Sequence, residues 1–255
     1  MPIAIHHATN LNGSDKNYDV ILTFDYETLN TKIEKTASDL KEMLQKVGIS
    51  AENMRGMHFD IVAHSMGGLV SRYLIEKLDG NSFVSNLILF GTPNSGSELA
   101  DLRIMVTNML TLTVNGAVFL KPYVAPLMFL GKMLNRLMVT IDELNPQSDF
   151  IHSLNDAPDA NVPYFIFAGN TEFFAEKDPK QYKFYQKIVN TIKKRGIYAA
   201  ADWWFDEPND LAVQVKSVKT VGKQSRVKFS ELASDHFCFF TPQSVAIKAI
   251  NEVLV

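Results

Sequence analysis

The stretch that most constrains the fold is FDIVAHSMGGLV at residues 59–70. A short apolar run enters a turn of small residues, and apolar residues at helical spacing follow directly as far as Leu78. Ala63 and Gly67 lie two residues before and after Ser65, which is the G-x-S-x-G pattern with alanine in place of the first glycine. Because strand and helix backbones approach closely at such a turn, only small residues fit there. The pattern predicts that Ser65 lies at a helix N-terminus, where free N–H groups favour negative charge.

A serine between a strand and a helix can also be only an N-cap. The longer string AHSMGGLV at residues 63–70 is more specific than the five-residue pattern. It resembles the nucleophile elbow of lipase- and esterase-like α/β-hydrolases, in which a histidine before the serine and two glycines after it are common. The resemblance implies the α/β-hydrolase fold, with a mostly parallel central sheet flanked by helices, and Ser65 as the nucleophile.

The composition of the chain limits its number of domains and its classes of partner. The 255 residues, 46% hydrophobic and 21% charged, suffice for one large α/β domain spanning 1–255. A formal net charge of -3 does not favour nucleic acid as a partner. The single cysteine, Cys238, excludes an internal disulfide, and residues 1–19 show no signal-peptide pattern. We therefore expect a cytoplasmic protein without cofactor or metal, although a secreted parent with its leader removed is an alternative.

Apolar runs and helical periodicity alternate along much of the chain. Thr31 and Glu34 form a candidate capping box before an apolar stripe that ends at Gly48. This alternation predicts βαβ units and a mostly parallel sheet. Strands are predicted near residues 19–24, 58–65, 84–90, 162–170 and 226–229, and helices near 33–47, 66–78, 179–195 and 242–255.

The alternation stops between residues 97 and 158, where the range 104–140 is apolar and rich in methionine. Polar residues and two prolines argue against a membrane span, whereas a buried core helix is an alternative. We favour a helical cap, because α/β-hydrolases often carry a lid at this place and its apolar surplus suits an oily substrate. Candidate residues for a substrate pocket are Met105, Met109, Leu112, Leu127 and Met133.

A serine nucleophile needs a general base, and the base needs a carboxylate that fixes its tautomer. In this fold the chain order is Ser, then Asp or Glu, then His. His236 follows the last predicted strand and precedes the C-terminal helix, which is the place the fold requires for the base. His152 also follows Ser65, but we expect it on a helix face or at the surface.

The acid is predicted in the loop before the last strand. The turn PNDLAV at residues 208–213 resembles the N-D-x-x-V segment that carries the acid in many lipase-like proteins, which favours Asp210. Asp206 and Glu207 are the alternatives in the same window. Asp235, adjacent to His236, is interpreted as a turn residue because it would struggle to reach the far ring nitrogen.

Two further segments extend the resemblance. FGTPNSG at residues 90–96 and LNPQSDF at residues 144–150 resemble segments of lipases and lecithin-cholesterol-acyltransferase-like enzymes. The chain departs from them at the oxyanion hole. The Met66 N–H is the expected first donor. The His-Gly-x stretch that supplies the second donor in relatives has its nearest equivalent in His7-Ala8-Thr9, with Ala8 in place of glycine and Thr9 as the candidate donor. Either this is a shortened oxyanion strand or that piece of the fold is missing.

The sequence therefore predicts a serine hydrolase that cleaves carboxylic esters through Ser65, His236 and Asp210. The alternatives are a lipid acyltransferase and a weakly catalytic binding module of a larger protein. The expected partner is a small-molecule or lipid ester, and the cap is compatible with transient contact with a membrane or lipid surface. The oligomeric state does not follow from the sequence.

Overall fold

Four parallel strands form the central sheet of the computed structural model, which describes residues 18–26, 31–97, 142–173, 207–210, 212–236, 238–240 and 245–254. The strands are β1 (Asp60–His64), β2 (Asn86–Phe90), β3 (Tyr164–Gly169) and β4 (Val227–Leu232), and they neighbour one another in chain order. His64 pairs with Phe90, and Phe90 pairs with Phe167, so the carboxyl ends of the strands lie at one edge. Parallel pairing of consecutive strands requires crossover connections, as the sequence predicted.

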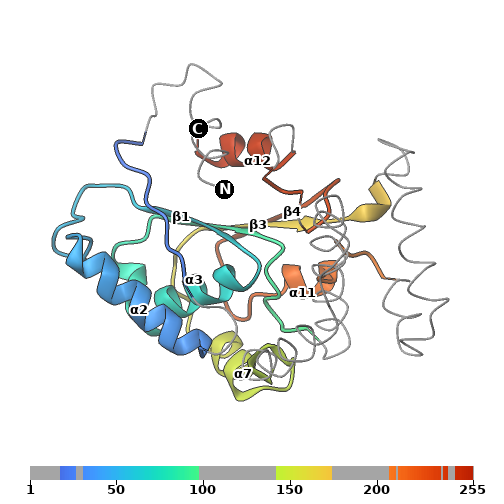
Figure 1. The fold of residues 1–255 in the computed structure, drawn as a ribbon, viewed down its shortest axis with the longest axis horizontal. Helices are drawn as coiled ribbons and strands as arrows, with labels where there is room; N and C mark the ends of the chain where they lie inside the picture. The colour runs from blue at the N-terminus through green and yellow to red at the C-terminus, as the bar shows by residue number, and fades with distance from the viewer. Residues whose placement is uncertain are drawn as a thin grey trace, which may run out of the picture.

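Helices cover both faces of this sheet (Figure 1). One face carries α2 (Ile33–Lys46), α3 (Met66–Lys77), α7 (Asp149–Asn155) and α11 (Val215–Lys219), and the other carries α12 (Val245–Leu254). Two short 3₁₀ turns, η1 (Gly80–Ser82) and η2 (Thr171–Phe173), follow α3 and β3. None of the helices in the described part of the chain is both long and apolar enough to cross a membrane.

The core follows the two-residue period of the strands. Leu87 and Leu89 of β2 pack on one face of the sheet, and Ile88 and Phe90 pack on the other, beneath α12. All four side chains are fully buried. Because both faces are covered at β2, this strand reads in the sequence as a continuous apolar run rather than as an alternating pattern, whereas β4 alternates and exposes Lys228 and Ser230.

The segment at residues 19–24 differs from the prediction, because no strand is assigned there. Val20 and Leu22 are 68% and 52% exposed. β-Branched composition reports how well a side chain fits a pleated surface, but a strand also needs a partner for its ladder of hydrogen bonds. The composition was present at residues 19–24, and the described structure gives that segment no such ladder.

The predicted capping box at the start of α2 is also wrong. The N-cap is Lys32, whose side chain makes no capping hydrogen bond, and Glu34 lies inside the helix. The N–H of Ile33 instead donates to Glu143 Oε2 at 2.8 Å. A carboxylate near a helix N-terminus is favourable whatever its place in the chain, and here it comes from 110 positions further on.

The chain leaves the sheet and returns to it at one place. The N–H of Ser97 donates to the carbonyl oxygen of Leu144 at 2.8 Å, which ties the two sides of residues 98–141 together. Those residues lie outside the described part, so the predicted cap is described only at residues 97 and 142–158. In that part, Phe150, Ile151 and Leu154 of α7 pack in a cluster with side chains of α2 and α3.

Candidate active site

The turn after β1 holds Ser65 in a strained backbone conformation. Its φ is 55° and its ψ is -132°, which residues with a side chain rarely adopt. The Ser65 side chain makes no capping hydrogen bond, so the structure does not support a simple N-cap. The Ser65 N–H donates to the carbonyl oxygen of Phe90 at 2.9 Å, which fixes the turn to the adjacent strand. This is the strand–turn–helix geometry of a nucleophile elbow.

The glycines after Ser65 are explained by close packing. A Cβ atom at Gly68 would lie 2.0 Å from Thr92 Oγ1, so any side chain there would displace the loop after β2. A Cβ atom at Gly67 would lie 3.3 Å from the hydroxyl of Tyr26. The two glycines therefore let the first turn of α3 lie directly against the loop after β2 and against Tyr26.

Asp210 and His236 form a buried hydrogen-bonded pair. The Nδ1 atom of His236 lies 2.8 Å from Oδ2 of Asp210, and the two residues are 2% and 0% exposed. The other carboxylate oxygen, Oδ1, accepts the N–H groups of Ala212 at 3.0 Å and Val213 at 2.7 Å. Both oxygens therefore have partners, and the N–H donors hold the carboxylate plane in position for the imidazole.

Two glycines at strand ends make room for this pair. Gly91, with φ of 56°, follows β2, and a Cβ atom there would lie 2.9 Å from Asp210 Oδ2 and 3.0 Å from His236 Nδ1. A Cβ atom at Gly169, the last residue of β3, would lie 2.7 Å from Asp210 Cβ. The pattern of the sequence did not single out these positions, although a glycine directly after or at the end of an apolar strand is the available signal.

The three predicted triad residues belong to loops at the same edge of the sheet. Ser65 follows β1, Asp210 lies in the connection from β3 to β4, and His236 follows β4. The ring of His64, directly before Ser65, lies against the ring of His236 with centroids 4.6 Å apart. The elbow and the His–Asp pair are thereby brought into contact, through a residue that the sequence analysis did not assign.

The other candidates occupy different places. Glu207, an alternative acid, is exposed, and His152 is exposed on α7. Asp235 Oδ1 accepts the N–H of Cys238 at 3.0 Å, as expected for a turn residue. Met66 is the first residue of α3, where its N–H belongs to the helix N-terminus. Outside the described ranges lie Thr9, Asp206 and the five predicted pocket residues Met105, Met109, Leu112, Leu127 and Met133.

Burial controls the charge of two groups beside the pair. It lowers the pKa of His64 to about 3, with the neighbouring His236 as a further cause, so His64 is neutral near pH 7. Burial raises the pKa of the Cys238 thiol to about 12, with Asp235 adding to the effect, which keeps this thiol protonated. Within the described ranges, no three His, Cys, Asp or Glu side chains gather as a metal site would require.

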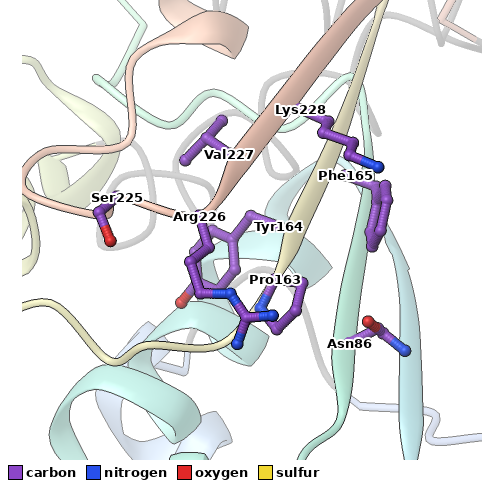
Figure 2. Close-up of a pocket in the computed structure, with 8 residues that line it drawn as sticks. All are labelled: Asn86, Pro163, Tyr164, Phe165, Ser225, Arg226, Val227 and Lys228. Atoms are coloured by element: carbon purple, nitrogen blue, oxygen red, sulfur yellow. The ribbon is translucent and has the colours of Figure 1, made fainter.

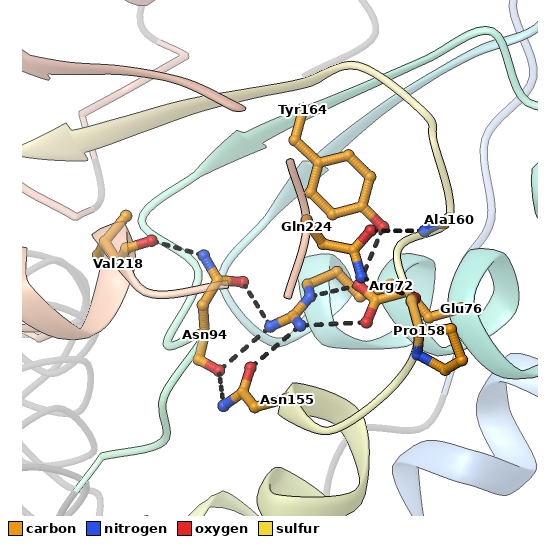
Figure 3. Close-up of polar contacts among 9 residues, drawn as sticks. All are labelled: Arg72, Glu76, Asn94, Asn155, Pro158, Ala160, Tyr164, Val218 and Gln224. Atoms are coloured by element: carbon orange, nitrogen blue, oxygen red, sulfur yellow. Dashed lines mark hydrogen bonds and ion pairs between the residues drawn. The ribbon is translucent and has the colours of Figure 1, made fainter. Parts of the chain in front are cut away.

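A buried polar cluster fixes α3 behind the elbow (Figure 3). Arg72 is 0% exposed and donates to Glu76 Oε1 at 2.8 Å, to the carbonyl oxygen of Asn94 at 3.2 Å and to Asn155 Oδ1 at 3.1 Å. Glu76 also accepts the hydroxyl of Tyr164 at 2.9 Å. One arginine thus joins the elbow helix to the loop after β2, to α7 and, through Glu76, to β3.

A hollow among the described residues lies far from the elbow (Figure 2). It has a volume of about 480 Å³ and includes Asn86, Tyr164 and Val227, the first residues of three strands. Ser65 follows the last residue of β1, at the opposite edge of the sheet. This hollow is therefore separate from the candidate active site.

Comparison with known proteins agrees with the geometry. Residues 4–255 match the family described as "Domain of unknown function (DUF7379)". Over 71 residues the chain is 39% identical to "Triacylglycerol lipase 2" of Saccharomyces cerevisiae, which is 27% of this chain and 22% of that protein. The structure resembles "Phospholipase PlaB from Legionella pneumophila" with a TM-score of 0.63 and 15% identity, covering 99% of this chain and 55% of that one.

These matches cover less than two thirds of either relative, and the resemblance to the phospholipase concerns the fold alone. The fold is that of the lipase- and esterase-like α/β-hydrolases, with a parallel four-stranded sheet between helices. With the match extending over residues 4–255, the chain belongs to the DUF7379 family.

Proposed function

We propose that this protein is a serine hydrolase that cleaves carboxylic esters. The observation that carries the proposal is the buried hydrogen bond of 2.8 Å between Asp210 and His236, at the sheet edge where the strained Ser65 turn lies. A buried carboxylate with an imidazole on one oxygen and two N–H donors on the other is the support that a general base needs. A histidine with a purely structural role would not require a strained serine at the same edge of the sheet.

In the proposed reaction, Ser65 Oγ attacks the ester carbonyl carbon while His236 Nε2 takes the hydroxyl proton. The negative charge that develops on the carbonyl oxygen is stabilised by the Met66 N–H at the start of α3. His236 then gives the proton to the leaving alcohol, and an acyl-enzyme remains on Ser65. Water attacks that ester with His236 as base, which releases the acid and restores Ser65. Asp210 holds the imidazole in the required tautomer throughout.

The names of the two relatives support a lipid ester as the substrate. The yeast protein is a triacylglycerol lipase and the Legionella protein a phospholipase, and both names refer to acyl esters. We also propose that the apolar range 104–140 contributes the acyl pocket, with Thr9 as the second oxyanion donor. Burial of a methylene stabilises by about 0.8 kcal/mol, so kcat/KM should rise between acetate and octanoate esters.

The test is hydrolysis of p-nitrophenyl acetate, butyrate and octanoate by the parent, Ser65→Ala and, as a control, His152→Gln. The parent and the control should release nitrophenol, with activity rising with acyl length, and Ser65→Ala should not. Product analysis with an added alcohol separates hydrolysis from acyl transfer, because a transferase would form the new ester in preference to the free acid. A well-folded parent that turns over none of these esters would favour the binding module and contradict the proposal.

A further inference from the structure

The ring of His64 is surrounded by three aromatic side chains from the segment that carries His236. Its centroid lies 4.6 Å from that of His236, and the two rings are inclined by 42°. The rings of Phe239 and Phe240 meet it edge-on, each with a centroid distance of 5.7 Å. One side chain of the elbow therefore fills the space beside the imidazole of His236.

The two ring nitrogens of His64 differ in their hydrogen bonding. The ring makes a hydrogen bond to the backbone of His236, while its buried Nε2 atom has no partner among the described residues. A protonated imidazole has two donors, so a proton on Nε2 would leave a buried charge unsatisfied. The pKa of about 3 agrees with this geometry, since burial is its largest cause. The titratable groups that face the ring are His236 and, hydrogen-bonded behind it, Asp210.

We propose that His64 is a positioning residue for His236, holding the imidazole by ring contact on one side and by a hydrogen bond to the His236 backbone. The inference rests on the proposed hydrolase function and adds to it a residue outside the triad. Asp210 fixes His236 through Nδ1, and neighbouring rings limit how far the buried imidazole can tilt about that hydrogen bond: His64 with a centroid distance of 4.6 Å and Phe239 with one of 6.4 Å. Because the His64 ring is the closer of the two, we infer that it sets the orientation of the imidazole that the proposed proton transfer from Ser65 requires.

The neutral charge state of the His64 ring also helps it to support His236 during the proposed reaction. During the proposed reaction His236 becomes an imidazolium, and a second positive charge on the adjacent ring would oppose it. A neutral aromatic ring instead offers its π electrons to the cation. His64 can therefore support His236 in both protonation states, whereas a positively charged side chain at this place would oppose the imidazolium.

The test compares His64→Ala, which removes the ring, with His64→Phe, which keeps an aromatic ring and removes both nitrogens. His152→Ala is the control, because it removes an exposed histidine from α7. With an ester substrate, His64→Ala should lower kcat at least tenfold and leave KM within twofold. It should also shift the acid limb of the profile of kcat/KM against pH. His64→Phe should recover most of kcat, and the control should match the parent.

A second readout does not depend on turnover. The proton shared by His236 Nδ1 and Asp210 should give a downfield NMR resonance that persists in the parent and in His64→Phe, and broadens or disappears in His64→Ala. The inference would be overturned if a folded His64→Ala variant kept the kcat, the acid limb and the NMR resonance of the parent. It would also be overturned if His64→Phe performed no better than His64→Ala in both the kinetic and the NMR measurement. If the parent hydrolyses no ester while the resonance depends on His64 as described, the proposed function fails and the positioning role stands.

Discussion

Asp210 and His236 are joined twice, once through their side chains and once through their backbones. The side-chain contact spans 2.8 Å from Nδ1 to Oδ2, and the N–H of His236 donates to the carbonyl oxygen of Asp210 at 2.9 Å. The backbone bond fixes the separation of the two loops before the side chains are considered. The orientation of the pair is therefore a property of the fold, and substitutions in it should affect catalysis more than stability.

The first prediction concerns the acid. Asp210→Asn should fold and lower kcat by about 10⁴, the loss known for the equivalent change in a serine protease, because the amide permits the wrong imidazole tautomer. Glu207→Gln is the matched control, since Glu207 is an exposed carboxylate three positions away. Ester hydrolysis and thermal unfolding of both variants check the prediction. If Glu207→Gln lost more activity than Asp210→Asn, the acid of the triad would be Glu207 and not Asp210.

The second prediction concerns the space that Gly91 leaves. Gly91→Ala should reduce turnover by more than 10²-fold, because its Cβ atom would lie within 3.0 Å of both Asp210 and His236. Gly56→Ala is the control for backbone strain. Gly56 has φ of 77°, and nothing lies within 4 Å of its added Cβ atom. In both variants the left-handed backbone should lower the free energy of unfolding, measured in urea, by about 1–2 kcal/mol. Equal activity of the two would contradict the steric argument.

The third prediction concerns the polar cluster behind the elbow. Arg72→Met should cost about 3–5 kcal/mol of unfolding free energy, because it leaves the buried Glu76 carboxylate uncompensated. Removing both charges in Arg72→Met/Glu76→Met should cost less than the single change. Lys35→Met, which breaks the exposed pair with Asp39, should cost about 0.5 kcal/mol or less. An Arg72→Met variant as stable as Lys35→Met would show that the cluster contributes little.

The fourth prediction concerns stability against pH. The pKa of His64 falls from 6.5 in the unfolded chain to about 3 in the fold, so between these values the unfolded chain binds the extra proton. Its stabilising contribution is complete above pH 6.5 and decreases as the pH falls towards 3, by up to about 1.4 kcal/mol per pH unit. His64→Phe lacks this proton, so urea unfolding at pH 7, 5 and 4 should give it the shallower decline. Parallel declines would contradict the assigned pKa.

Much of the fold could be predicted from local patterns. Residues 60–64, 86–90 and 164–169 form strands that apolar runs predicted, and 227–232 forms the strand predicted from RVKF at 226–229, within a few residues at their ends. The turn around Ser65 has the backbone that its small neighbours implied. Each of these features depends on a few adjacent residues, because two buried faces demand apolar side chains and a tight turn demands small ones.

The features that the sequence did not reveal depend on contacts between distant segments. Glu143 caps α2 from 110 positions away, so no local motif could replace the mistaken capping box. Arg72 and Glu76, spaced as an ordinary surface pair, are buried because three other segments enclose them. The space that Gly91 leaves for His236 likewise depends on a residue far along the chain. Such facts follow from tertiary packing, which a linear pattern does not contain.

The proposed reaction depends on Ser65 being an activated nucleophile. The most direct measurement is the reaction of the protein with a fluorophosphonate, followed by intact mass and peptide mapping. One adduct per chain, located on Ser65, lost in Ser65→Ala and slowed by orders of magnitude in Asp210→Asn, is the predicted result. An unlabelled parent, or an adduct that persists in Ser65→Ala, would show that Ser65 is not the nucleophile.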